Sequence, residues 1–166
     1  MDSQAMCTLG RLFAYPLVKP GQEDLDHMGG CGKRLIPMLE QTDLLSLQEE
    51  YVRLFINSLP ETPCPPYGSF YLEGTLMGRT TLKLRDLHLE YGLESDELAD
   101  HVAVELEFLG LLTRLREESE QVGQDRDYVL GHFRKWAPAF LKRLEEHDGS
   151  GFYKSLGRCL DQAIAS

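Results

Sequence analysis

Apolar residues recur at spacings of three and four along most of the chain, which is typical of amphipathic α-helices with one buried face. The clearest stripes are Leu9, Leu12 and Phe13; Leu44, Leu47, Tyr51, Leu54 and Phe55; and Val102, Leu106, Leu109 and Leu112. No segment shows a convincing strand pattern. The sequence therefore predicts an all-α protein.

Glycine and proline mark the breaks between the predicted helices. Gly92 follows Tyr91 and is expected to end a helix. Four prolines predict a rigid, extended connector at about residues 58–68, because proline lacks a backbone donor and restricts the residue before it: Pro60, Pro63, Pro65 and Pro66. Pro138 should kink or restart a late helix. We expect about seven to nine helices in a single globular bundle over residues 1–166.

Length and composition agree with one domain. The 166 residues are 42% hydrophobic and 27% charged, which suits a globular fold with a sizeable core. Residues 1–17 lack the basic segment and cleavage site of a secretory signal, and no apolar run is long enough to span a bilayer, so a cytoplasmic location is expected. The four cysteines are scattered without metal-site spacing, which predicts reduced thiols.

The formal net charge is -10, from 27 acidic and 17 basic residues. This balance opposes a nucleic-acid backbone and is compatible with a cationic partner. The segment 86–112 contains no Lys or Arg, and its acidic residues are Asp86, Glu90, Glu94, Asp96, Glu97, Asp100, Glu105 and Glu107. By itself, such a segment usually forms a solvated acidic face.

The search for catalytic motifs is largely negative. The run Gly29–Lys33 lacks the spacing and the preceding strand of a phosphate-binding loop, and no Glu-x-x-His motif or nucleophile elbow occurs. His101 and Glu105 lie one helical turn apart and could share a proton or a metal, although a contact on a helix surface explains the pair equally well. Nothing in the sequence requires an enzyme or a bound metal.

Two blocks of the sequence carry a resemblance to a known family. The first comprises Glu50–Phe55, Pro63–Tyr71 and Met77–Gly78; the second comprises Tyr91–Leu93 and Asp100–Leu109, in which an Asp-His pair opens a helix reading Glu-Leu-Glu-Phe-Leu. Together they resemble the signature of the TorD/DmsD/NarJ family of redox-enzyme maturation chaperones. The family often has proline just before the Asp-His pair, whereas Leu98 and Ala99 stand there in this chain.

The resemblance implies an all-α chaperone without a cofactor. It would bind the twin-arginine signal peptide of a molybdoenzyme precursor until the molybdopterin cofactor is in place. Such a peptide needs carboxylates for its arginines and an apolar trough for the rest. The residues that would supply them are Tyr51, Leu54, Phe55, Pro66, Tyr67, Ser69, Tyr71, Asp100, His101 and Glu105. Taken singly, the apolar residues of this set are also typical core residues. Ser69 and Tyr71 could simply cap and pack the following helix, with no role in binding.

Two alternatives stay open. One is a NarJ-like chaperone, whose client is a cytosolic respiratory reductase subunit without an export signal. The other is a small helical hydrolase or metalloenzyme that uses His101, Glu105 and Glu107. Relatives in the family are monomers or helix-swapped dimers, so a homodimer by helix swapping is compatible with the resemblance.

Overall fold

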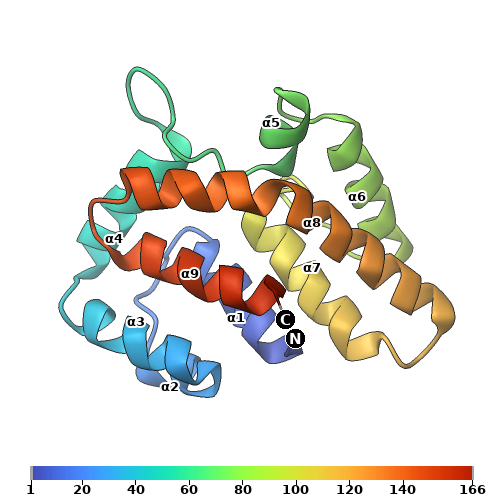
Figure 1. Ribbon diagram of the computed structural model, residues 1–166, viewed down its shortest axis with the longest axis horizontal. Helices are drawn as coiled ribbons and strands as arrows, with labels where there is room; N and C mark the ends of the chain where they lie inside the picture. Colours follow the sequence, from blue (N-terminus) through green and yellow to red (C-terminus); the bar gives the residue numbers. More distant parts are fainter. Residues whose placement is uncertain (1, 166) are drawn as a thin grey trace.

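The computed structural model describes residues 2–165, which form nine α-helices and no β-strand. The elements are α1 (Ser3–Phe13), α2 (Gln22–Leu25), the 3-10 turn η1 (Asp26–Met28), α3 (Gly30–Glu40), α4 (Leu44–Tyr51), the π-helical turn η2 (Val52–Ile56), α5 (Gly68–Glu73), α6 (Arg79–Glu90), α7 (Val102–Leu115), α8 (Glu120–His147) and α9 (Phe152–Ala165) (Figure 1). The all-α fold predicted from the sequence is confirmed.

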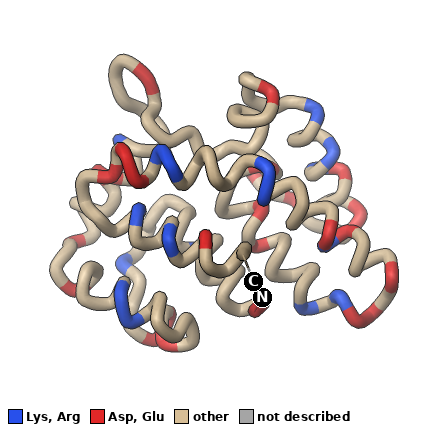
Figure 2. The backbone as a smooth tube through the Cα atoms, viewed as in Figure 1, with Lys and Arg blue, Asp and Glu red and all other residues tan. Residues whose placement is uncertain are grey.

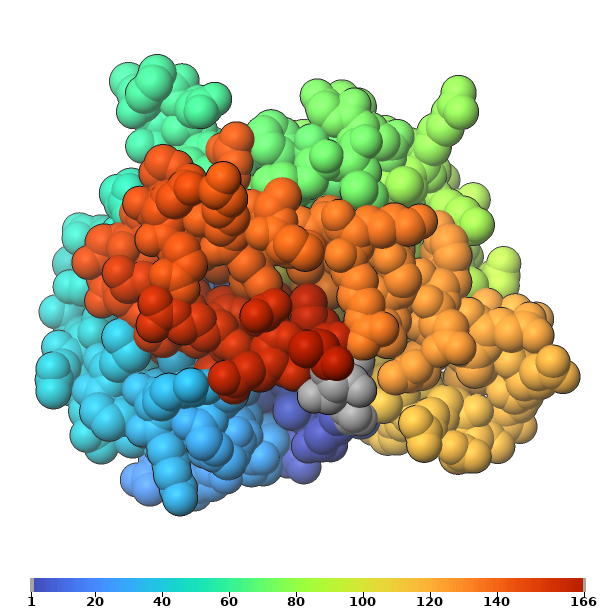
Figure 3. Space-filling model, in the orientation of Figure 1, coloured from blue at the N-terminus to red at the C-terminus, as the bar shows by residue number. Residues whose placement is uncertain are grey.

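The centre of the molecule consists of α1, α7, α8 and α9. α1 packs along α7, while α8 contacts both α7 and α9. Figure 1 shows α8 spanning the molecule, with α3 and α4 at one end and α6 at the other. In Figure 3, α8 and α9 cover the middle of the face that is drawn. The long helix α8 therefore connects the two ends of the bundle.

Two glycines allow α1 and α7 to approach closely. A Cβ atom added at Gly110 would lie 2.5 Å from Sγ of Cys7 and 3.0 Å from the carbonyl oxygen of Ser3. One added at Gly10 would lie 2.9 Å from the carbonyl oxygen of Ala103. These distances are too short for an added carbon, so the helix pair depends on both glycines.

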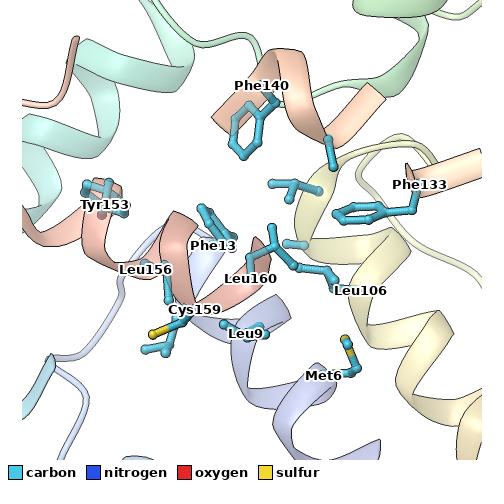
Figure 4. Close-up of a cluster of buried hydrophobic side chains, with 14 of the residues drawn as sticks. Met6, Leu9, Phe13, Leu106, Phe133, Phe140, Tyr153, Leu156, Cys159 and Leu160 are labelled. Carbon is cyan, nitrogen blue, oxygen red and sulfur yellow. The ribbon is translucent and has the colours of Figure 1, made fainter. Parts of the chain in front are cut away.

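Aromatic side chains from several helices form much of the core (Figure 4). Phe140 of α8 lies edge-on to Phe13 of α1 at a ring-centroid distance of 5.8 Å, and tilted against Trp136 at 5.6 Å. Phe55 lies edge-on to Tyr153 of α9 at 5.1 Å. Such pairs contribute about 0.5–1.5 kcal/mol each beyond their burial. They join the first and last helices of the chain in one core.

The proline-rich connector interrupts the helical structure, whereas Pro138 does not. Helical structure ends at Ile56 and resumes at Gly68, so the predicted connector lies between helices; in Figure 1 part of it projects as a loop. Pro138, in contrast, lies inside α8, which continues to His147. Figure 1 shows α8 bent in its middle part, in agreement with a proline-induced kink.

Acidic residues outnumber basic ones along the chain. Figure 2 marks Asp and Glu positions on most parts of the backbone trace, and the stretch from Asp86 to Leu112 carries no Lys or Arg. Within residues 2–165, none of the helices combines the length and the apolar composition needed to cross a membrane.

Candidate functional site

The end of the proline-rich connector pairs with the segment that precedes α7. The Gly68 N–H donates to the carbonyl of Asp100 over 3.0 Å, and the Val102 N–H donates to the carbonyl of Pro66 over 2.8 Å. Tyr67 and His101 thereby form an isolated antiparallel bridge. The two sequence blocks that carry the resemblance therefore meet in space.

Asp100 is fully buried and has a structural partner. Its Oδ2 accepts a hydrogen bond of 2.7 Å from the backbone N–H of Ser69, at the start of α5. Its Oδ1 finds no partner among the described residues. Asp100 thus fixes α5 to the segment before α7, and its carboxylate does not reach the surface.

His101 caps α7. Its ring Nδ1 accepts a hydrogen bond of 3.1 Å from the backbone N–H of Ala103, so the N-cap interaction requires an unprotonated Nδ1. Burial lowers the pKa of His101, although the nearby charges of Glu97 and Asp100 act in the opposite direction. The ring lies edge-on to Tyr67 at 5.2 Å. The neutral imidazole is therefore part of the same bridge.

Glu105 is buried between α7 and α8 and is hydrogen bonded to side chains of α8. Its Oε1 lies 2.5 Å from Nδ1 of His132, and its Oε2 accepts a hydrogen bond of 3.2 Å from Nε1 of Trp136. Burial raises the pKa of Glu105 to about 7. Of the two readings left open for His101 and Glu105, neither a shared proton nor a contact on the helix surface is seen, because Glu105 is buried against α8 while His101 caps α7. The described residues contain no group of three or more His, Cys, Asp or Glu side chains placed to hold a metal ion.

A cavity of about 260 Å³ lies beside the Tyr67–His101 bridge, and we call it the first cavity. Its lining includes the predicted residues Tyr51, Phe55, Pro66, Tyr67 and His101, together with Ala14, Tyr15, Ile56, Glu97, Ala103, Val104 and Glu107. None of these residues is Lys or Arg. The first cavity thus combines aromatic and apolar walls with carboxylates.

The two carboxylates have distinct environments. Oε1 of Glu97 accepts a hydrogen bond of 3.1 Å from the hydroxyl of Tyr67. Glu107 is exposed on α7, and its partial desolvation raises its pKa, opposed by the charge of Arg11. Both belong to the acidic segment noted in the sequence.

The remaining predicted site residues do not line the first cavity. Leu54 and Ser69 are buried. Tyr71 stacks on Trp136 with a centroid distance of 5.8 Å. Asp100 and Glu105 are held in the hydrogen bonds described above. In this structure these side chains contact other parts of the protein, and their contact with a partner stays a prediction.

Sequence reasoning missed Tyr15, Ile56 and Val104 as cavity residues. Tyr15 and Ile56 lie at or just after the ends of helical segments, and both are exposed although apolar. An exposed aromatic or aliphatic residue beside a predicted signature is a usable signal, but the sequence does not show which exposed residues share one cavity.

Comparison with known proteins agrees with this description. A family model for the nitrate reductase delta subunit matches residues 26–142, which include both sides of the bridge. DmsD of Haemophilus influenzae, named as a probable Tat proofreading chaperone, is 30% identical over 130 residues, covering 75% of this chain and 61% of that protein. The chaperone protein TorD of Vibrio parahaemolyticus is 29% identical over 129 residues, covering 70% of this chain and 60% of that protein. The chain thus spans about three fifths of the length of these relatives.

A solved structure extends the comparison to the whole chain. The crystal structure of a candidate redox enzyme maturation protein from Archaeoglobus fulgidus matches with a TM-score of 0.73 and 29% identity, covering 100% of this chain and 95% of that one. The fold is therefore that of the all-α class to which this maturation protein belongs. Because the family model covers most of the chain, the protein belongs to the TorD/DmsD/NarJ family.

Proposed function

We propose that the chain is a cytoplasmic maturation chaperone. It holds the twin-arginine signal peptide of a molybdopterin-containing oxidoreductase precursor and assists cofactor insertion and assembly before export. Family membership and the relatives named as DmsD and TorD chaperones support this proposal. The chaperone itself makes and breaks no covalent bond in this role.

The observation that carries the proposal is the first cavity beside the Tyr67–His101 bridge. A twin-arginine signal peptide joins guanidinium groups to an apolar stretch, so its receptor needs both carboxylates and apolar surface. The first cavity offers Tyr51, Phe55 and Ile56 on its walls, and Glu97 and Glu107 as carboxylates. Because no Lys or Arg lines it, a cationic segment meets no basic side chain on the cavity wall.

The buried positions of two acidic residues change which carboxylates should meet the peptide. Asp100 and Glu105 are buried and hydrogen bonded, so exposing either charge would require breaking those bonds. Glu97 and Glu107 line the cavity at exposed positions, so their charges need not be moved out of the interior. We therefore assign the electrostatic contact to Glu97 and Glu107, with Asp100 and Glu105 maintaining the shape of the site.

The test is a binding measurement with purified chain and fluorescently labelled synthetic signal peptides from molybdoenzyme precursors of the source organism. Fluorescence anisotropy should show saturable binding, and Glu97→Gln should weaken it roughly three- to tenfold because one carboxylate charge is lost. The amide oxygen of the replacement side chain can still accept from the Tyr67 hydroxyl, so the cavity wall keeps its hydrogen bond. Glu61→Gln removes the same charge from an exposed position outside the cavity and serves as the matched control. Failure of every such peptide to bind would overturn the proposal.

A second candidate is a NarJ-like chaperone of a cytosolic reductase subunit. The match to the nitrate reductase delta subunit model favours it. A client without an export signal has no twin arginines to recognise, so replacing both arginines of a competitor peptide should not alter its effect on binding. A strong loss of competition on that replacement would reject this candidate.

A further inference from the structure

A second cavity, of about 420 Å³, lies between α6 and the segment 93–99. It adjoins the first cavity, because Glu97 and Val104 line both. Apolar side chains form much of its wall, and Met77, Leu82 and Leu89 among them are exposed although apolar. A partner that occupies the first cavity can therefore continue into the second.

His88 places an unsatisfied acceptor at the second cavity. The side chain is only 6% exposed, lines the cavity, and lies in stacked contact with Phe108 at 3.9 Å. Its Nδ1 lies 2.7 Å from the carbonyl oxygen of Leu84, which can only accept, so Nδ1 carries the proton. Burial lowers the pKa of His88, which keeps the ring neutral. Its Nε2 is then a buried lone pair that no described residue satisfies.

Thr81 adds a second unsatisfied group on the same helix, α6. It is 3% exposed and lines the cavity, and its hydroxyl oxygen finds no partner among the described residues. Native proteins rarely leave such atoms unpaired, because each costs about 1–3 kcal/mol. Because His88 and Thr81 both belong to the wall of the second cavity, a ligand there that reaches their two buried atoms would satisfy both.

The charges around the second cavity define the sign of that ligand. Glu94, Asp96 and Glu97 line it, against Arg85 as the one basic residue in the lining. Arg85 is largely exposed, with its guanidinium 3.5 Å from Asp86. The cavity therefore favours a cation. His88 Nε2 and the Thr81 hydroxyl further require that this cation donate hydrogen bonds.

We propose that the second cavity is a subsite for one arginine side chain of the client segment, with the guanidinium donating to His88 and Thr81. This inference rests on the proposed function. A guanidinium has five donors in a planar fork and is weakly hydrated, so it suits a cavity with neutral acceptors inside and carboxylates at its edge. Its three-carbon stem packs on the apolar wall formed by residues such as Leu82 and Leu89. The compact, strongly hydrated ammonium group of lysine fits this environment less well.

The experiment is a double-mutant cycle between the chain and the peptide, read by isothermal titration calorimetry. The chain variants are Thr81→Val and His88→Phe, which remove the polar atoms while keeping shape and the stacking on Phe108. The peptides are the parent and two versions in which one or the other arginine is norleucine, which keeps the apolar stem. We expect each chain variant to weaken the parent peptide about tenfold, and to have little effect on the peptide that lacks the bound arginine.

Thr113→Val is the matched control. The Thr113 hydroxyl is also buried and unpartnered, but it lines neither cavity. This variant should bind all peptides within about twofold of the wild type. Circular dichroism and thermal unfolding establish that each variant is folded. The double replacement Glu94→Gln with Asp96→Asn lies at exposed positions and tests the same coupling if an α6 variant fails to fold.

Each outcome has a defined meaning. Coupling between the α6 variants and one arginine supports the subsite. Equal losses with the parent and the norleucine peptides would overturn it, because His88 and Thr81 would then act only on the fold, and so would unchanged affinity for the parent peptide. A wild-type chain that binds no twin-arginine peptide would overturn the proposed function, and the subsite with it.

Discussion

Nδ1 of His132 lies 2.5 Å from Oε1 of Glu105, and both side chains are buried between α7 and α8. Trp136 donates to the other carboxyl oxygen, so one residue of α7 satisfies two groups on α8. A Cβ atom at Gly68 would lie 2.9 Å from Nε1 of Trp136 and 3.0 Å from Cε1 of His132. The start of α5, and with it the Tyr67–His101 bridge, is therefore positioned on this buried network.

Glu105 should make stability depend on pH. Burial raises its pKa from 4.5 to about 7, opposed by the hydrogen bonds from His132 and Trp136. Between these values the folded chain binds more protons than the unfolded chain, so the stabilisation from the protonated carboxyl is lost as the pH rises through about 7. Relative to Glu105→Gln, the wild type should lose free energy of unfolding between about pH 5 and about pH 8. Urea unfolding across this range measures the difference, and a constant difference would contradict the shift.

Two glycine replacements, one at the contact between α1 and α7 and one in α8, should change the free energy of unfolding in opposite directions. Gly110→Ala places a carbon against Cys7 and Ser3 and should destabilise the chain by about 1–3 kcal/mol. Gly131→Ala lies in α8, where nothing is within 4 Å of the added carbon, and should stabilise it by up to about 1 kcal/mol. Urea unfolding at one pH compares the two. A destabilised Gly131→Ala would show that helix propensity does not control that position.

Asp100 should contribute mainly to the free energy of unfolding, and it should affect peptide binding only by maintaining the fold. Asp100→Ala leaves the buried N–H of Ser69 without its acceptor, and we expect a loss of about 1–2 kcal/mol. Asp96→Ala changes an exposed residue of the same segment and should cost less than about 0.5 kcal/mol. Thermal unfolding monitored by circular dichroism distinguishes them. Equal stability of the two variants would remove Asp100 from its structural role.

The helices were predictable from the sequence because their apolar stripes repeat locally. The stripe from Val102 to Leu112 and the break at the prolines both appear where periodicity and backbone chemistry place them. The continuity of α8 through Pro138 was less predictable, because its packing against α7, α9 and α5 supports the helix across the missing hydrogen bond.

The site was only partly predictable, because residues distant in sequence determine which hydrogen bonds each side chain makes. His101 and Glu105 are one turn apart, yet Glu105 is paired with His132 of another helix while His101 caps its own. Similarly, Thr81 and His88 show no motif, and their unsatisfied atoms become visible only after the core around α6 is formed. Motif resemblance located the bridge, whereas tertiary packing determined which carboxylates face the cavity.

Lysine replacements at Ile56 and Leu59 should distinguish binding in the first cavity from binding at the connector beside it. Both are exposed apolar residues after α4, at 57% and 93%, but only Ile56 lines the first cavity. Ile56→Lys removes an apolar contact and adds a charge that repels a cationic segment, so affinity for a twin-arginine peptide should fall about tenfold. Leu59→Lys makes the same change at an exposed position of the connector between η2 and α5, and should stay within about twofold of the wild type. Anisotropy titrations at low and high salt should show the Ile56→Lys deficit shrinking as charges are screened. Equal losses would show that the effect is not specific to the first cavity, and no loss in either variant would exclude the first cavity as the binding site.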